Sequence, residues 1–163
     1  NQPFDYFGLN CYWGDTVSAG ANDKRQIASQ STGHPLTAFH WPVTPDALYW
    51  GPKFLYERYK LPILITENGL SNSDWVSLDG SVHDPQRIDH MARYLAAFSR
   101  AYQDGVEVAG YLHWSIMDNF EWAEGMKHRF GLIHVDYRDQ KRTLKDSAHW
   151  YTEVIRTNGE SLL

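Results

Sequence analysis

The sequence alternates short apolar runs, which predict β-strands, with longer amphipathic stretches, which predict helices. Strands that alternate with helices form a parallel sheet with helices packed on its faces. The sequence therefore predicts one α/β unit over residues 1–163. The expected strands cover residues 4–12, 61–66 and 107–116, and the expected helices begin near Thr44, Asp84 and Asp146.

Several local signals set the limits of these elements. Thr44-Pro45-Asp46 offers a capping hydroxyl and a first-turn proline, although Gly51-Pro52 should interrupt the helix that follows. Asp84-Pro85 begins the clearest helix, and Gly105 is placed as its stop. Residues 14–40 lack periodicity and predict a long loop, whereas residues 131–142 predict a hairpin that turns near Asp139 and Gln140. The apolar face of the clearest helix is expected to comprise Ile88, Met91, Leu95, Phe98 and Tyr102.

The segment "LPILITENGL", residues 61–70, places an ionisable group at the end of a buried strand. Its continuous aliphatic run is typical of a strand covered on both faces. Asn68-Gly69 tolerates positive φ and should end that strand. Glu67 then lies where an unpaired charge is expensive. It is either a carboxylate paired with a cation, or a nucleophile or general base.

Polar side chains follow the carboxyl end of each expected strand: Asn10 and Tyr12, then Glu67 and Asn68, then the segment 114–121. The carboxyl ends of parallel strands meet at one edge, where α/β sheets and barrels place their active sites. A complete (β/α)8 barrel takes about 250 residues. The chain is therefore either a small open α/β domain or part of a barrel.

Composition excludes several classes of partner. A net charge of −5 without a Lys/Arg stripe predicts no binding to nucleic acid or to a membrane surface. One cysteine and eight histidines without ligand spacing predict no metal and no cofactor. No apolar run approaches the roughly 20 residues of a membrane span. The first residues carry neither a basic segment nor an apolar core, so we expect a cytoplasmic protein.

The loop after the third strand, "MDNFEWAEGMKHRF", combines aromatic and acidic residues. Most loop carboxylates are simply solvated, and Glu121 and Glu124 have that interpretation. The pair Glu121-Trp122 suits a sugar better, because a carboxylate accepts hydrogen bonds from hydroxyl groups while an indole covers the apolar face of the ring. A carbohydrate is therefore a candidate ligand.

The motifs "ITENGL", "HWSIMDNFEWAEG", "RFGLIHVDY" and "TLKDSAHWY" together resemble the carboxyl-terminal part of glycoside hydrolase family 1 β-glucosidases. The resemblance implies a (β/α)8 TIM barrel of which this chain holds about the last three βα units. It implies that Glu67 is the catalytic nucleophile, with Tyr12 and Asn10 as its hydrogen-bond partners. It further implies a sugar subsite in which Trp114 stacks beneath the ring and Phe130 lines the pocket. In that subsite Glu121 would bind the 4- and 6-hydroxyl groups, and Trp122 the 3- and 4-hydroxyl groups.

This resemblance implies a retaining mechanism, in which two carboxylates about 5 to 5.5 Å apart act as nucleophile and acid/base. The strand would hold Glu67, and Asn68-Gly69 would turn the chain away to leave room for the sugar. The expected substrates are β-glucosides or short β-linked oligosaccharides, with β-galactosides and β-fucosides as further candidates. Glu121 should repel the phosphate of 6-phosphoglycosides.

The sequence departs from the family in lacking the Asn-Glu-Pro motif that carries the acid/base glutamate. Three hypotheses follow. The chain is part of a β-glucosidase that needs an amino-terminal barrel partner bearing the acid, or it is a carbohydrate-binding remnant, or it is a partial barrel that self-associates to cover its sheet edges. A retained nucleophile favours the first hypothesis.

Overall fold

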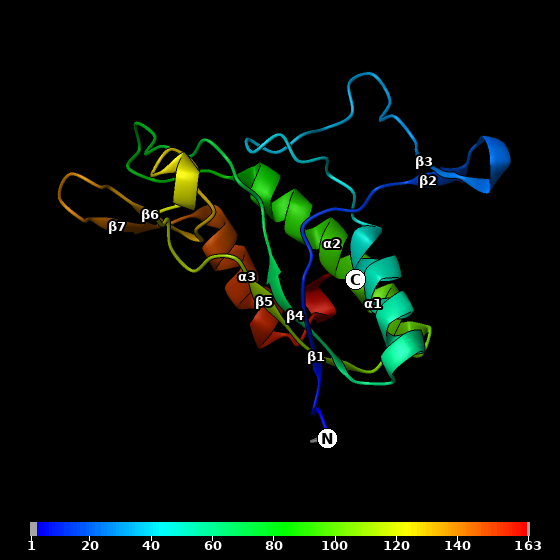
Figure 1. Ribbon diagram of the computed structural model, residues 1–163. Helices are drawn as coiled ribbons and strands as arrows, with labels where there is room; N and C mark the ends of the chain where they lie inside the picture. The colour runs from blue at the N-terminus through cyan, green and yellow to red at the C-terminus, as the bar shows by residue number, and fades with distance from the viewer. Residues whose placement is uncertain (1–2, 163) are drawn as a thin grey trace.

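The computed structural model describes residues 3–162, and Figure 1 follows the chain through them. The order of elements is the predicted alternation of strands and helices, with short hairpins and 3₁₀ turns added. The elements are β1 (Phe7–Asn10), β2 (Val17–Ala19), η1 (Ala21–Asp23), β3 (Arg25–Ile27), α1 (Ala47–Tyr59), β4 (Ile63–Asn68), α2 (Pro85–Gln103), β5 (Val108–His113), η2 (Trp122–Glu124), β6 (Ile133–Val135), β7 (Arg142–Leu144), α3 (Asp146–Arg156) and η3 (Glu160–Leu162).

A three-stranded parallel sheet in the order β1-β4-β5 organises the fold. Its register places Asn10 beside Glu67 and Asn68 beside His113. The loops that leave β1, β4 and β5 therefore emerge at the same end, toward which β4 points in Figure 1. This confirms the α/β fold of a partial barrel. Strands β1 and β5 are shorter than predicted, whereas β4 has the predicted length and lies two residues later.

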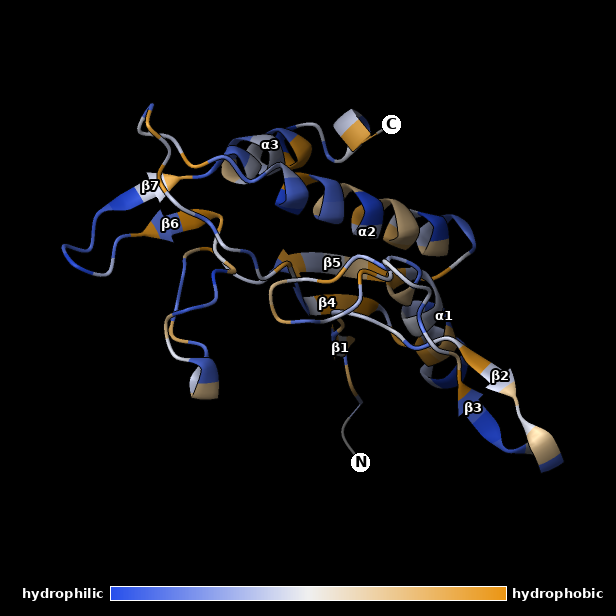
Figure 2. Ribbon diagram, turned by 90° about the horizontal axis from the view of Figure 1, so that it is seen from above, coloured by the Kyte–Doolittle hydropathy of each residue, from blue (hydrophilic) through white to orange (hydrophobic). Residues whose placement is uncertain are grey.

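Burial alternates from residue to residue over positions 63–66 of β4. Ile63 and Ile65 are fully buried and pack with Leu48 of α1 and with Tyr94 and Phe98 of α2. Leu64 and Thr66, on the other face, are half-buried. The expectation of a strand covered on both faces is therefore wrong for this chain, because its helices cover one face; Figure 2 shows α2 and α3 side by side there.

Helix α1 differs from its prediction at its start, near Thr44, and at Pro52. Thr44 caps no helix: its hydroxyl accepts a hydrogen bond from the Gly14 amide at 3.0 Å, and the helix begins at Ala47. Pro52 lies inside the helix without ending it, and its ring is buried. The proline costs a helical hydrogen bond, but tertiary packing of α1 against α2 outweighs this local preference.

Helix α2 begins at Pro85, and Gly105 follows its end with a φ of 94°, as predicted. Its buried face contains Met91 and Phe98 but not Tyr102, which is 64% exposed. Polar groups occupy part of that face. Its buried residues are Arg87, His90, Met91, Tyr94, Ala97, Phe98 and Ala101.

Two antiparallel hairpins extend from the sheet. The first, β2-β3, lies in the segment predicted as an irregular loop, and Figure 1 shows it projecting away from the sheet. Its residues are exposed, so the sequence carried no burial pattern from which to predict it. The second, β6-β7, is the predicted one, and Gln140 occupies its turn with a φ of 64°. Helix α3 begins at Asp146, as predicted.

Candidate active site

Glu67 lies half-buried near the carboxyl end of β4. The Tyr12 hydroxyl donates a hydrogen bond to its Oε2 atom at 2.8 Å. The ion pairs among the described residues 3–162 do not include Glu67. Within this part of the chain, the partner of Glu67 is thus a phenol, and the interpretation as a structural ion pair finds no cation.

Tyr12 remains a hydrogen-bond donor over the whole physiological range. Burial raises the pKa of its hydroxyl well above the usual range, and the carboxylates of Glu67 and Glu121 raise it further. The phenol therefore keeps its proton and serves as the donor to Glu67.

Packing fixes the position of Tyr12. Its ring centroid lies 5.0 Å from that of Trp41 and 6.4 Å, edge-on, from that of Phe130. Its carbonyl oxygen accepts a hydrogen bond from the Tyr94 hydroxyl at 3.0 Å. Because Tyr94 belongs to α2, this helix holds the backbone of Tyr12 in place.

Asn10 lies beside Glu67 in the sheet but does not have the expected hydrogen bond. Its Oδ1 atom accepts a hydrogen bond from the Thr66 hydroxyl at 2.6 Å. The expectation that Asn10 binds Glu67 directly is therefore wrong for the described chain. The Asn10 side chain binds Thr66 instead, which is the residue before Glu67 on β4.

The Asn68-Gly69 pair is constrained by contacts and not by positive φ. Neither residue is among those with positive φ in the described chain. Asn68 is fully buried, where its amide donates to the Cys11 carbonyl and accepts from the Tyr111 hydroxyl, both at 2.8 Å. A Cβ atom on Gly69 would lie 1.9 Å from the Trp114 carbonyl oxygen. The glycine is required because the next loop passes directly against it.

Trp114 opens the loop that follows β5, here called the 114–130 loop. Its amide donates to the Asn68 carbonyl at 2.9 Å, and its peptide bond to Ser115 is cis. The indole is half-buried. The backbone of Trp114, the predicted stacking residue, therefore lies next to Asn68, the residue that follows Glu67.

Glu121 and Trp122 occupy the outer part of the 114–130 loop. Glu121 is half-buried, and its carboxylate accepts a hydrogen bond from the Asn119 amide at 3.3 Å. Trp122 is 81% exposed. Both groups are thus free to meet a ligand. Glu124, by contrast, forms ion pairs with Lys127 and His128, which agrees with its interpretation as an ordinary surface acid.

Phe130 was expected to line the pocket, but it is only 1% exposed. It packs against Tyr12, Phe39 and Trp41. Its role in this chain is to support Tyr12 from behind. The sequence did not predict the aromatic cluster formed by Phe39, Trp41 and Phe130, because Phe39 lies in a segment without periodicity and Trp41 directly follows that segment.

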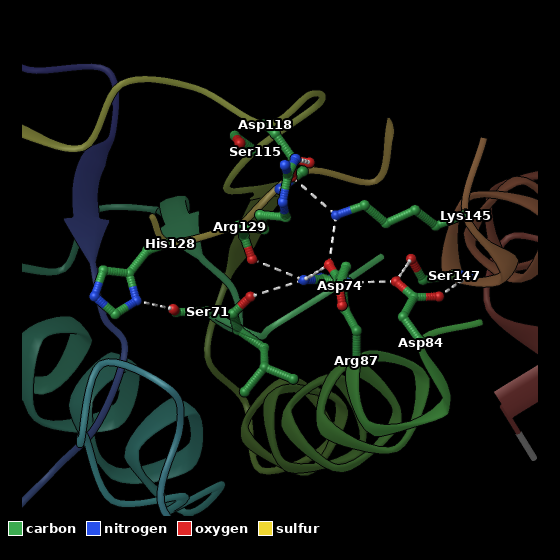
Figure 3. Close-up of polar contacts among 12 residues, drawn as sticks. Ser71, Asp74, Asp84, Arg87, Ser115, Asp118, His128, Arg129, Lys145 and Ser147 are labelled. Atoms are coloured by element: carbon green, nitrogen blue, oxygen red, sulfur yellow. Dashed lines mark hydrogen bonds and ion pairs between the residues drawn. The ribbon is translucent and has the colours of Figure 1, made fainter. Parts of the chain in front are cut away.

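Sequence reasoning also missed a buried ionic network beneath the 114–130 loop, shown in Figure 3. It joins the segment after β4, the start of α2, the 114–130 loop and the start of α3. The one sequence signal for this network is Arg87, because a charged residue on the same helical face as Met91 and Tyr94 indicates a buried ion that needs partners. The charged members are Asp74, Asp84, Arg87, Asp118, Arg129 and Lys145.

Among residues 3–162, no group of three His, Cys, Asp or Glu side chains could hold a metal ion. Over the same range, no helix is long and apolar enough to cross a membrane. The absence of a cofactor and the cytoplasmic location stay predictions.

A strand-end carboxylate with a phenol donor, beside a loop that presents an acid and an indole, is an arrangement typical of a carbohydrate-active βα-barrel enzyme. The model of glycosyl hydrolase family 1 matches residues 1–160. The chain belongs to this family.

Named relatives agree with this assignment. The chain is 44% identical over 159 residues to the 1,4-beta-D-glucan glucohydrolase of Thermotoga neapolitana and 42% identical to beta-glucosidase A of Thermotoga maritima; each alignment covers 97% of this chain. A solved structure of the Thermotoga maritima beta-glucosidase in complex with noeuromycin superposes with a TM-score of 0.87 at 43% identity over 96% of this chain. The chain spans about 36% of the length of these relatives.

Proposed function

We propose that this chain supplies the nucleophile and the sugar-binding loop of a retaining β-glucosidase. The observation that carries the proposal is the Tyr12–Glu67 hydrogen bond at the end of β4, in a chain that belongs to glycosyl hydrolase family 1. A remnant that only binds sugar has no need of a carboxylate held in this way. The hydrogen bond thus favours catalysis over the carbohydrate-binding alternative.

In the proposed reaction, a Glu67 oxygen attacks the anomeric carbon while the bond to the leaving oxygen breaks. A glutamic acid on the amino-terminal barrel partner gives its proton to that oxygen, and a glycosyl ester forms on Glu67. The same glutamate then takes a proton from water, whose oxygen attacks the anomeric carbon and releases Glu67. Two inversions leave the β-configuration unchanged.

Tyr12 and Asn10 have supporting roles in this proposal. The phenol donates to the ionised carboxylate and fixes its rotamer toward the sugar. Asn10 acts through Thr66, which it binds beside Glu67 on β4. The sugar ring rests on Trp114, and Glu121 and Trp122 bind its hydroxyl groups. Phe130 contributes only by packing behind Tyr12.

The amino-terminal partner is inferred from the sheet. Among the described residues, β1 and β5 form the edges of the order β1-β4-β5, and each has one side free to pair. Further barrel strands on both edges would close the sheet and cover the half-buried face of β4. Native mass spectrometry of the purified material should show the 18.9 kDa chain together with a companion that carries the remaining barrel strands.

The basic side chains of the 114–130 loop favour an unphosphorylated substrate. Lys127 and His128 pair with Glu124, and Arg129 pairs with Asp118. A phosphate at the 6-position would meet Glu121 without a free cation from this loop. We therefore assign plain β-glucosides or short β-linked oligosaccharides as the substrate class.

The test uses this chain co-expressed with the amino-terminal barrel portion of the same enzyme. The assembly should hydrolyse an aryl β-glucoside and should prefer it to the 6-phosphorylated analogue. Glu67→Gln should lower kcat/KM by at least about 10⁴-fold, because the nucleophile is lost. An assembly that folds but shows no hydrolysis, or one that Glu67→Gln leaves active, would overturn the proposal.

A further inference from the structure

An ion pair closes the base of the 114–130 loop. Arg129 Nη1 donates to Asp118 Oδ2 at 2.6 Å, and Glu121 and Trp122 lie between these two residues in the chain. Asp118 also accepts hydrogen bonds from the Gly131 amide at 3.0 Å and the Val135 amide at 3.3 Å. The two ends of the sugar-binding segment are thus held together at one carboxylate.

Lys145 ties this base to the segment that follows the nucleophile strand. Its Nζ atom donates to Asp118 Oδ1 at 2.9 Å and to Asp74 Oδ2 at 2.5 Å. Figure 3 shows the ammonium group between the two carboxylates. One cation therefore links the Asp118–Arg129 base to the chain that leaves β4 after Glu67.

Arg87 reinforces this link from α2. Its Nη2 atom donates to Asp74 Oδ2 at 2.8 Å, to the Arg129 carbonyl at 2.9 Å and to the Leu70 carbonyl at 3.3 Å. Leu70 lies three residues beyond Glu67. The guanidinium group consequently touches both the segment after the nucleophile and the end of the 114–130 loop.

The network is balanced in charge and almost dry. The carboxylates of Asp74, Asp84 and Asp118 face the cations of Arg87, Arg129 and Lys145; every one of these side chains is fully buried except that of Arg129, which is 18% exposed. In such surroundings an ion without its partner is costly, so the members hold one arrangement. Replacing such a network by well-packed apolar residues often costs no stability, so we assign this one a role in geometry.

The hydrogen bonds of residues 120–125 are local, whereas Asn119 and His128 on either side also contact Tyr137, Phe39 and Ser71. The Glu121 amide donates to the Gly125 carbonyl at 2.7 Å, and Trp122 is 81% exposed. The place of Glu121 relative to Glu67 is therefore decided at the base of the loop. We propose that Lys145 is a positioning residue, which sets the distance between the nucleophile and the sugar-binding side chains of the 114–130 loop by bridging Asp74 and Asp118.

This inference rests on the proposed function, and a comparison of substrates separates positioning from stability. In the assembled barrel, Lys145→Met should lower kcat/KM for an aryl β-glucoside about tenfold more than for the aryl β-xyloside, which lacks the hydroxymethyl group that Glu121 would bind. Lys53→Met, which removes a cation from the exposed Asp104 pair, should leave this ratio within about twofold. An equal loss on both substrates would reduce Lys145 to a structural role.

A second measurement needs no activity. In hydrogen exchange of the 163-residue chain, Lys145→Met should speed exchange of the amides in residues 119–128 about tenfold and leave those of α1 unchanged. The charge-balanced variant Asp118→Asn/Lys145→Met should do the same with a smaller loss of stability. Uniform acceleration, or none, would overturn the inference. If the wild-type assembly hydrolyses nothing while the loop still responds, the proposed function fails and the bridge stands.

Discussion

The two parts of the candidate site are held in place by different means. Glu67 belongs to a strand, and the Tyr12 hydroxyl fixes its carboxylate at 2.8 Å. Glu121 and Trp122 belong to an irregular loop whose outer part is largely exposed. Its base is set by the ions around Asp118. Strand pairing positions the proposed nucleophile, whereas buried charges together with backbone hydrogen bonds at the base of the loop position the proposed sugar-binding groups.

This difference accords with the chemistry that each part would perform. Attack on an anomeric carbon needs an orientation accurate to a fraction of an ångström, and a paired strand provides it. Binding of hydroxyl groups tolerates a loop, provided that the loop has a fixed base. The parts should therefore respond differently to substitution.

Arg87→Met should cause a large loss of stability. The variant leaves Asp74 and Asp84 without their guanidinium partner, and loss of one member of a buried pair costs about 3–5 kcal/mol. Urea unfolding of the chain measures this loss. Arg93→Met on the same helix is the control, because its pair with Asp89 is exposed and its loss should change the free energy of unfolding much less. Equal losses of stability in the two variants would mean that water reaches the ions of the network.

Tyr12→Phe tests the strand-held part. The variant removes the donor to Glu67, and a hydrogen bond to a charged group is worth about 1.5–3 kcal/mol. The kcat/KM of the assembled barrel should fall by about 10- to 150-fold, with little change in folding. The exposed Tyr6→Phe serves as the control. Unchanged kcat/KM in Tyr12→Phe would remove Tyr12 from the site.

Acid should lower the stability of the chain, because a buried neutral histidine packs against Tyr94, the residue that binds the Tyr12 backbone. His90 stacks on Tyr94, and burial followed by the nearby Arg87 lowers the pKa of His90 to about 3. The unfolded chain takes up this proton near pH 6.5, so stability is full above that pH and declines between about 6.5 and 3. The slope is up to about 1.4 kcal/mol per pH unit for each such histidine, and His113 behaves in the same way.

Urea unfolding at pH 7.5 and pH 5.0 measures this decline, and His90→Phe should make it shallower. His83 provides the opposite control. Its exposed ring binds Asp146, which raises the His83 pKa, so its contribution is present in acid and is lost as pH rises. His83→Gln should therefore steepen the decline toward pH 5.0. Identical slopes for His90→Phe and the wild-type chain would contradict the assignment of His90 as a buried neutral group.

The smallest effect should come from Trp122→Ala. The indole is 81% exposed, so the free energy of unfolding should change by less than about 0.5 kcal/mol. Phe130→Ala, in the same loop but 1% exposed, should cost about 3–5 kcal/mol. Urea unfolding compares the two variants directly. A Trp122→Ala loss as large as that of Phe130→Ala would mean that the outer part of the loop is packed.

The elements that sequence predicted well carry regular patterns. Strand β4 follows from its continuous aliphatic run and helix α2 from apolar periodicity. The shared edge that unites Tyr12 with Glu67 follows from the alternation of strands and helices. Pro52 shows where such reasoning fails, because packing against α2 overrides a local helix-breaking signal.

The ionic network could not be read from the sequence for a different reason. Asp74, Asp118 and Lys145 lie far apart in the chain, and each alone is typical of a solvated surface residue. Only the fold brings them within hydrogen-bond distance of one another. The requirement for glycine at position 69 could not be predicted for the same reason. It arises because the carbonyl group of Trp114, in a later loop, occupies the space that a side chain would need.

The most direct test of the account is covalent labelling of the nucleophile. An active assembly is treated with an aryl 2-deoxy-2-fluoro-β-glucoside, which slows release of the glycosyl ester, and the chain is digested and mapped by mass spectrometry. We expect one fluoroglucosyl group, on the peptide that contains Glu67. A label on Glu121 or on any other carboxylate of an assembly that hydrolyses β-glucosides would contradict it.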